Sequence, residues 1–262
     1  MPPIPAPPVA ATDSMATIAA IGLVAYVSAD VAHHAFGHGA ACLALGCRLE
    51  SLSSVFVQCS CTGATIDLAG PLANLLLGVG ALGAARFGPP MATSGRLLLL
   101  LAAAFNLFYF AGQLVAGAAT KTDDWAWSLQ HFRLPAFTQY GLVAAGIFTY
   151  LVTMRLLAVQ LAPFAFPRAR LMKLLSHAWA AAGLIACATA ALDHQPLPAI
   201  LYHAVPQALL LPLGLLGVPA RASRWATPMA VEGALPFSWT WVIVAVIAGL
   251  TSIVVLGPGI TV

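Results

Sequence analysis

The residues best suited to chemistry are one aspartate and three histidines within nine positions, Asp30, His33, His34 and His38. His34 and His38 are four residues apart, so on an α-helix they lie on one face, one turn from each other. Two imidazoles at this spacing can bind a single metal ion. Asp30 lies four residues before His34 on the same face, where it would either bind the metal or orient a ligating imidazole. This pattern predicts a metal site built around His34 and His38.

A second arrangement of these histidines remains open. On a regular α-helix His33 is rotated about 100° away from His34. However, His33 and His38 are five residues apart, a spacing that a π-bulge brings to one face. The non-metal alternative is that the histidines form hydrogen-bonded packing contacts between helices.

A carboxylate further along the chain is the candidate third ligand. Asp123 and Asp124 follow the third long apolar run and are expected on the same side of the membrane as the histidines. Two histidines and one carboxylate leave a coordination position open for water, which is typical of a catalytic site. The alternative is a solvated loop with Trp125 at the membrane interface.

The composition indicates what kind of scaffold holds these residues. The chain has 262 residues, of which 61% are hydrophobic and only 7% charged, and its mean hydropathy is +0.92. A soluble domain carries about 25% charged residues, so a soluble enzyme and a nucleic-acid-binding protein are excluded. We therefore predict an integral membrane protein that contacts lipid, binds no nucleic acid, and belongs to a bacterial inner membrane.

Seven apolar stretches approach the roughly 20 residues that a membrane-spanning helix requires. The fold expected is an all-α polytopic membrane protein with six to seven transmembrane helices, and Pro206 and Pro212 make the sixth stretch the least regular. Residues 48–62 are rich in Ser, Val and Cys, which predicts a short re-entrant or β-like segment after the first helix. The stretches are residues 15–45, 64–85, 96–119, 138–162, 171–192, 197–218 and 238–256.

The chain divides into three regions on this basis. Residues 1–14 are predicted to be a disordered, proline-rich tail, because five of the first eight residues are proline. Residues 15–130 form the metal-binding, catalytic-core-like transmembrane region, and residues 131–262 supply additional transmembrane helices.

The distribution of basic residues predicts the orientation. If all seven stretches cross, seven Lys and Arg residues lie on the N-terminal side and three on the other, which favours a cytoplasmic N-terminus. Cys42, Cys47, Cys59 and Cys61 then face an oxidising compartment, where disulfides form, and three pairings are open. The alternative is a soft-metal site built from Cys59 and Cys61 with Cys42 or Cys47.

A polar interruption opens the second apolar stretch, with the sequence Gly70-Pro71-Leu-Ala-Asn74. Proline in a membrane helix frees backbone groups for another partner, and the Asn74 amide can both donate and accept. The alternative is an ordinary interhelical hydrogen bond from Asn74 with close packing at Gly70.

Taken together, these motifs resemble the intramembrane site-2-type metalloproteases over about residues 25–130. His34-Ala-Phe-Gly-His38 is similar to that family's H-E-x-G-H motif, and Gly70-Pro-Leu-Ala-Asn74 to its Gly-Pro-x-x-Asn element. Asp124 falls at about the distance of the family's third zinc ligand. The resemblance implies that His34, His38 and Asp124 bind zinc. It also implies that Gly70, Pro71 and Asn74 help to bind an extended, membrane-embedded peptide or small hydrophobic substrate.

The chain departs from the family at the general base. Ala35 stands where the motif has glutamate, and alanine cannot transfer a proton. The chain is therefore an inactive protease variant, a non-proteolytic relative, or an enzyme that uses another base, for which His33 and Asp30 are the nearby candidates. Also, no proline precedes Asp124, and Trp125 follows it.

Two other functions remain open. A His and Asp cluster also suits iron or copper in a membrane metallo-oxidoreductase, which requires no glutamate base. A non-catalytic relative that binds a membrane partner is the third hypothesis.

Overall fold

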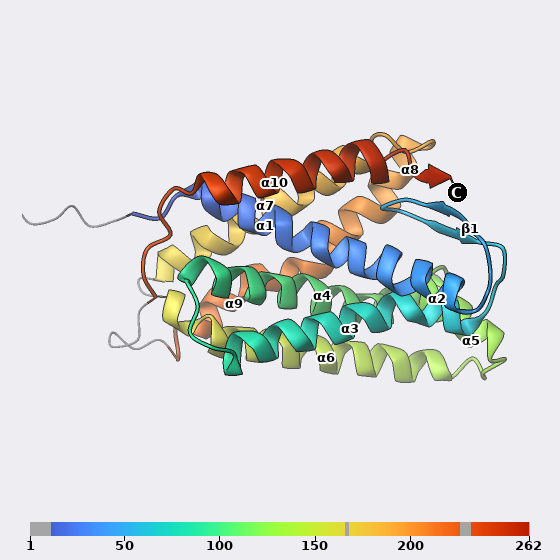
Figure 1. The fold of residues 1–262 in the computed structure, drawn as a ribbon. Helices are drawn as coiled ribbons and strands as arrows, with labels where there is room; N and C mark the ends of the chain where they lie inside the picture. Colours follow the sequence, from blue (N-terminus) through green and yellow to red (C-terminus); the bar gives the residue numbers. More distant parts are fainter. Residues whose placement is uncertain (1–11, 166–167, 226–231, 262) are drawn as a thin grey trace, which may run out of the picture.

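A computed structural model describes residues 12–165, 168–225 and 232–261 (Figure 1). Seven helices in this part of the chain are long and apolar enough to cross a membrane, which confirms the prediction of an all-α polytopic protein. The sixth stretch is one of them, despite its prolines. The seven spans are Met15–Ala44, Ala64–Phe87, Thr93–Thr120, Thr138–Gln160, Ala169–Ala190, Pro196–Ala222 and Trp239–Leu256.

The helix in the centre of the bundle is α4 (Thr93–Thr120), which packs against α1 (Met15–Val31), α3 (Ala64–Phe87) and α6 (Thr138–Gln160). Most of α4 is buried on all sides, whereas the other spans turn large apolar side chains outward. Phe36, Leu76 and Leu184 are each more than 70% exposed. An apolar outer surface of this extent suits lipid and not water.

The first span changes its hydrogen-bonding pattern part of the way along. After α1 the chain forms the π-helix η1 (Ala32–Gly39), in which the N–H of Ala40 reaches back to the carbonyl of Ala35, and then α2 (Ala40–Ala44). Such π segments are rare and occur often at functional sites. All three histidines of the candidate site lie within η1.

The sixth span contains further irregular turns. It runs through α8 (Pro196–Ala199), the π segments η3 (Ile200–Ala204) and η4 (Pro206–Leu210), the 3₁₀ segment η5 (Leu211–Leu213) and α9 (Gly214–Ala222). Pro206 and Pro212 cause this because proline cannot donate the backbone hydrogen bond of a regular helix. The remaining helices are α5 (Asp124–His131), η2 (Ala162–Phe164), α7 (Arg168–Ala190), α10 (Trp239–Thr251) and η6 (Ser252–Leu256).

A small antiparallel sheet covers one end of the bundle, in the order β2-β1-β3. Strands β1 (Leu49–Leu52) and β2 (Val57–Cys59) form the expected β-like segment, and β3 (Ile260–Thr261) adds the C-terminal end of the chain. Helices α2 and α5 lie at this same end (Figure 1).

Two disulfides join this sheet region to the end of the first span. Cys42 pairs with Cys59, and Cys47 pairs with Cys61. The structure thus selects one of the three open pairings. It contradicts the soft-metal alternative, since all four sulfur atoms are used in disulfides.

The opposite end of the bundle is held by ion pairs. Asp13 accepts hydrogen bonds from the guanidinium of Arg170 and from the N–H of Leu235, and Arg96 donates to Glu232. Ser14 caps α1. Asp13 and Ser14 therefore lie in ordered structure, which differs from the tail predicted for residues 1–14, and residues 1–11 of that tail lie outside the described residues.

Candidate metal centre

The π-helix η1 determines which histidines share a face. Its turns close between residues five apart, and this places His38 one turn beyond His33. The two Nε2 atoms lie 3.1 Å apart. The regular-helix prediction paired His34 with His38, so the structure favours the alternative π arrangement of this segment.

The third member of the cluster comes from the other side of the bundle. Asp124 is the first residue of α5, and Asp123 caps that helix by accepting from the N–H groups of Trp125 and Ala126. Gln113 of α4 donates to Asp124 Oδ2 at 3.1 Å. The cap and the glutamine together fix the position of the Asp124 carboxylate.

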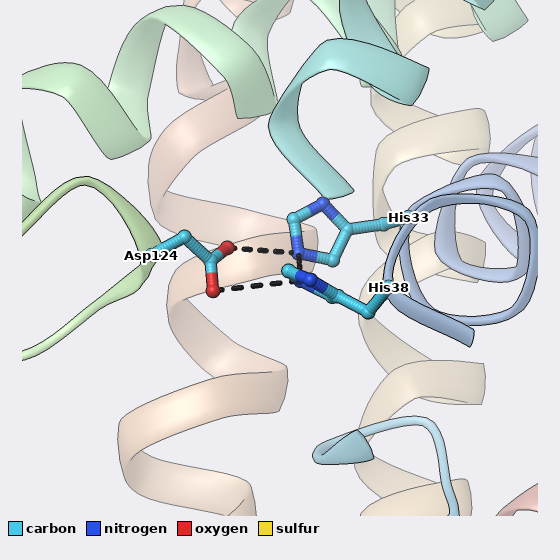
Figure 2. A group of neighbouring side chains, drawn as sticks. All are labelled: His33, His38 and Asp124. Carbon is cyan, nitrogen blue, oxygen red and sulfur yellow. Dashed lines mark hydrogen bonds and ion pairs between the residues drawn. The ribbon is translucent and has the colours of Figure 1, made fainter. Parts of the chain in front are cut away.

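His33, His38 and Asp124 converge on one buried point (Figure 2). Asp124 Oδ2 lies 3.1 Å from His33 Nε2, and Asp124 Oδ1 lies 3.4 Å from His38 Nε2. The three residues are 2%, 8% and 8% exposed. Two imidazole nitrogens and the two oxygens of one carboxylate, all able to bind a cation, therefore lie close together inside the protein.

The tautomer of His33 is fixed by a chain of amides. Asn106 donates to the carbonyl of Ala102, and its Oδ1 accepts from Asn74 Nδ2. Asn74 Nδ2 also donates to the carbonyl of Ala29, so Asn74 Oδ1 is the atom that faces His33 Nδ1, at 2.6 Å. Since that oxygen can only accept, His33 Nδ1 carries the proton and neutral His33 presents a bare Nε2.

The same reasoning applies to His38. Its Nδ1 lies 2.7 Å from the carbonyl oxygen of Ile66, which can only accept a hydrogen bond. His38 therefore donates from Nδ1 and also presents a bare Nε2 when neutral. Two lone pairs and a carboxylate then face one another, and this arrangement is repulsive unless a proton or a metal cation lies among them.

The spacing of the two imidazole nitrogens suits a shared metal ion. In a tetrahedral zinc site, bonds of about 2.0–2.1 Å place neighbouring ligand atoms about 3.3–3.4 Å apart. The two Nε2 atoms lie 3.1 Å apart, and each has a different oxygen of Asp124 nearby, at 3.1 Å from His33 and 3.4 Å from His38. A hydrogen bond from each Nδ1 to an oxygen is also the usual support for a metal-binding histidine.

Two glycines allow the helices to approach closely at this point. A methyl group on Gly70 would overlap His38 Nε2 and His33 Cε1, and one on Gly37 would overlap the backbone of Ala69 and Gly70. Only residues without a side chain fit, so α3 lies directly against η1. The two imidazoles consequently have one wall made of backbone.

The electrostatics of the aspartates follow from burial and their neighbours. Burial alone raises the pKa of the Asp124 carboxyl. When the imidazoles of His33 and His38 carry a proton on Nε2, their hydrogen bonds and charge outweigh burial and hold this pKa well below its ordinary value. Burial raises the pKa of Asp123 to about 7, helped by the charge of Asp124 and opposed by the hydrogen bonds from Ala126 and Trp125. Asp124 is therefore the ionised member of the pair at neutral pH.

His34 and Asp30 lie apart from the group formed by His33, His38 and Asp124. His34 Nδ1 lies 3.2 Å from both the carbonyl oxygen and Oδ1 of Asp30, and both residues are buried. His34 was predicted as a ligand, but the structure groups His33 with His38 and Asp124 and leaves His34 bonded to Asp30. The physical reason is the i+5 pattern of η1, which rotates His34 away.

The structure also places the residues that the sequence predicted to bind substrate, and that role stays a prediction. Asn74 has no exposed surface and orients His33, while Gly70 makes room for both imidazoles. Pro71 is buried inside α3 beside Gly70. These contacts place Gly70 and Asn74 behind the imidazoles. Ala35 lies within η1, and its methyl side chain cannot transfer a proton.

Two supporting groups were not singled out from the sequence as parts of the site. Asn106 and the carbonyl of Ile66 fix the two tautomers. Asn106 was detectable as a lone amide in an apolar span. The Ile66 carbonyl was not, since every residue carries one.

Comparisons of the chain with protein-family models, with curated proteins and with solved structures find no match. The resemblance to site-2-type metalloproteases therefore depends on the sequence motifs alone.

Proposed function

We propose that this protein is a membrane-embedded, zinc-dependent hydrolase of the site-2 protease type, with His33, His38 and Asp124 as the metal ligands. The observation that carries the proposal is the buried group formed by both Nε2 atoms and the Asp124 carboxylate, in which each of the three side chains has a separate supporting hydrogen bond. A site of this kind inside a membrane span is costly to build and is usually functional.

Each part of the site has a defined task under this proposal. Asn74 and Ile66 keep both imidazoles in the tautomer that can bind a cation, and Asp124 supplies the negative charge. His33, His38 and Asp124 would hold zinc, which would supply a coordinated water with a pKa of about 7 as the nucleophile for a peptide carbonyl.

An apolar groove beside the site supports a membrane-embedded substrate. It has a volume of about 580 Å³ and is bordered by Ala32 and Phe36 of η1 and by Ala73 and Leu76 of α3. These residues are sequence neighbours of the metal-site residues His33 and Asn74. The groove suits an apolar peptide segment or a small hydrophobic molecule.

We also propose a cytoplasmic N-terminus, with the sheet outside. Seven Lys and Arg residues occur at the N-terminal end of the bundle or in its loops and three at the sheet end, as the positive-inside rule requires. Both disulfides lie at the sheet end, which suits an oxidising compartment.

The test uses the full-length protein purified in lipid nanodiscs. We expect about one zinc per chain by mass spectrometry, and cleavage of a quenched fluorescent peptide with an apolar transmembrane sequence. A chelator should abolish cleavage and added zinc should restore it. A chain that binds no metal, or that cleaves equally well after chelation, would contradict the proposal.

The donor set also favours a second candidate, a metallo-oxidoreductase. Two histidines and one carboxylate form the set that holds non-haem iron, and the alanine at position 35 is no obstacle to that chemistry. Iron or copper in the purified protein, with a visible or electron paramagnetic resonance signal, would favour this candidate over the hydrolase. A third hypothesis, a non-catalytic relative, predicts normal function after His38→Ala.

A further inference from the structure

A hydrolase with Ala35 at the usual position of the base needs another proton acceptor. The two candidates from the sequence are both engaged in the structure. His33 donates from Nδ1 to Asn74, and its Nε2 faces Asp124. Asp30 forms an ion-pair contact with His34. The inference below rests on the proposed function and asks which other residues fill this role.

One face of α3 points to a candidate. Gly70 lies against His38 Nε2 and His33 Cε1, and Asn74, four residues later, bonds His33. Asp67 precedes Gly70 by three residues, so it lies on the same face, a rise of about 4.5 Å along the helix. The residue directly before Asp67 also contacts the site, because the carbonyl of Ile66 accepts the hydrogen bond from His38 Nδ1 at 2.7 Å.

Asp67 has a histidine partner on α5. His131 Nε2 lies 3.3 Å from Asp67 Oδ2, yet their orientation does not make a hydrogen bond. Asp67 Oδ2 is buried and has no hydrogen-bond donor among the described residues. This oxygen can therefore accept a proton from another group without breaking an existing hydrogen bond.

The pair connects solvent with the metal centre. The side chain of His131 is 39% exposed, whereas that of Asp67 is 16% exposed. His131 is the last residue of α5, the helix whose first residue is Asp124, at the sheet end of the bundle (Figure 1). A proton received by Asp67 can thus pass to an imidazole that water reaches.

We propose that Asp67 and His131 are the proton-transfer pair of this hydrolase, in place of a base at position 35. The nucleophilic water loses a proton to the Asp67 carboxylate while its oxygen bonds to the peptide carbonyl carbon. The carbon–nitrogen bond then breaks, its electron pair stays on nitrogen, and nitrogen takes the proton. His131 exchanges protons between Asp67 and solvent.

A purely structural role is the competing explanation. Asp67 lies in the first turn of α3, where a carboxylate stabilises a helix, and it ties α3 to α5. A structural role predicts that Asp67→Asn and His131→Ala lower stability or zinc content. A proton-transfer role predicts a slower reaction at unchanged zinc content.

The test compares zinc-loaded, full-length Asp67→Asn and His131→Ala proteins with wild type in nanodiscs. With the quenched transmembrane peptide we expect kcat to fall about 10²–10⁴-fold, with KM and zinc content unchanged. Imidazole in the buffer should partly restore His131→Ala, because the site of that side chain is open to water. His177→Ala removes another exposed histidine and should behave as wild type.

A second measurement is independent of activity. The imidazole NMR resonances of His131 in zinc-loaded protein should move in Asp67→Asn relative to wild type, because the carboxylate 3.3 Å from His131 Nε2 is replaced by an amide. The resonances of His177 should stay at their wild-type positions. Unchanged His131 resonances would overturn the pairing.

The outcomes separate this inference from the function on which it rests. If wild type cleaves the peptide and both variants stay within twofold of it, or if they lose zinc, the proton-transfer pair is overturned and the hydrolase stands. If wild type binds zinc without cleaving any peptide, the proposed function fails and this inference fails with it.

Discussion

The two ends of the bundle use buried charge in different ways. At the N-terminal end, the Asp13 carboxylate accepts three hydrogen bonds, two from Arg170 and one from the backbone of Leu235. Arg170 also donates to the carbonyls of Glu232 and Gly233. At this end the protein itself supplies a donor for each carboxylate oxygen of Asp13.

At the sheet end the balance is reversed. His33, His38 and Asp124 turn acceptor atoms toward one another. Among the described residues, the side-chain amide of Gln113 donates to Asp124 Oδ2. The hydrogen bonds to Asn74 and to the carbonyl of Ile66 increase this excess of acceptors, because they hold the proton of each imidazole on Nδ1 and leave Nε2 without one. At one end donors and acceptors are matched in ion pairs, whereas at the other end acceptors face one another, as the proposed metal site requires.

The largest expected effect on stability comes from removing the ion pair between Arg170 and Asp13 at the N-terminal end. Arg170→Met leaves Asp13 without its partner and should lower the free energy of unfolding by about 3 kcal/mol, the low end for a buried pair, because both side chains keep some solvent contact. Thermal unfolding in nanodiscs measures this. Lys173→Met, at an exposed site of the same helix, should change stability by less than about 0.5 kcal/mol. Zinc content should stay at the wild-type level in both variants.

At the sheet end the expected effect is on zinc affinity. Asp124→Asn keeps the shape of the side chain but removes its charge, so we expect zinc affinity to fall more than about 100-fold, beyond the loss typical of a residue that only supports a ligand. Competition with a zinc chelator measures the affinity, and an affinity within threefold of wild type would remove Asp124 from the site.

A smaller change in affinity is expected from the amide that orients His33. Asn74→Ala frees the His33 ring to rotate and to change tautomer, so zinc affinity should fall about 10–100-fold. Thr189→Val is a matched control, because it removes another buried interhelical hydrogen bond, to Ser252. If both variants weaken zinc binding equally, the loss reflects general destabilisation.

The smallest expected effect is a pH dependence of the unfolding temperature that Asp13 causes. Burial alone raises the pKa of Asp13, but the hydrogen bonds from Arg170 and Leu235 outweigh it and the pKa is lowered. Asp13 therefore contributes stability above about pH 4, its unfolded pKa, and this is lost as pH falls through the folded value. The difference in unfolding temperature between wild type and Asp13→Asn should narrow below pH 4. A constant difference down to pH 3 would contradict this cause.

The seven spans were predictable because their signal is local. Length and apolar composition alone identify a membrane helix, and each expected stretch overlaps an observed span. Even the sixth span, with Pro206 and Pro212, keeps its length because π and 3₁₀ turns absorb the missing hydrogen bonds. The small sheet was predictable in position, but its third strand was not, since β3 comes from the far end of the chain.

Which of two neighbouring histidines joins the cluster with His38 and Asp124 was not predictable from spacing. Whether His33 or His34 faces His38 depends on the hydrogen-bond pattern of η1, and that pattern accompanies the close contact of Gly37 with Gly70, 33 residues away. The tautomers likewise depend on Asn74 and Ile66 of another helix. Sequence supplied the residue types of the site, and tertiary packing selected among them.

The most direct test is therefore the zinc content of two neighbouring variants, His33→Ala and His34→Ala, purified in parallel with wild type. The structure predicts that His33→Ala loses its zinc, whereas His34→Ala retains about one zinc per chain. Loss of zinc from His34→Ala with retention in His33→Ala would restore the regular-helix pairing of His34 with His38. Retention in both would contradict a metal centre at this point in the molecule.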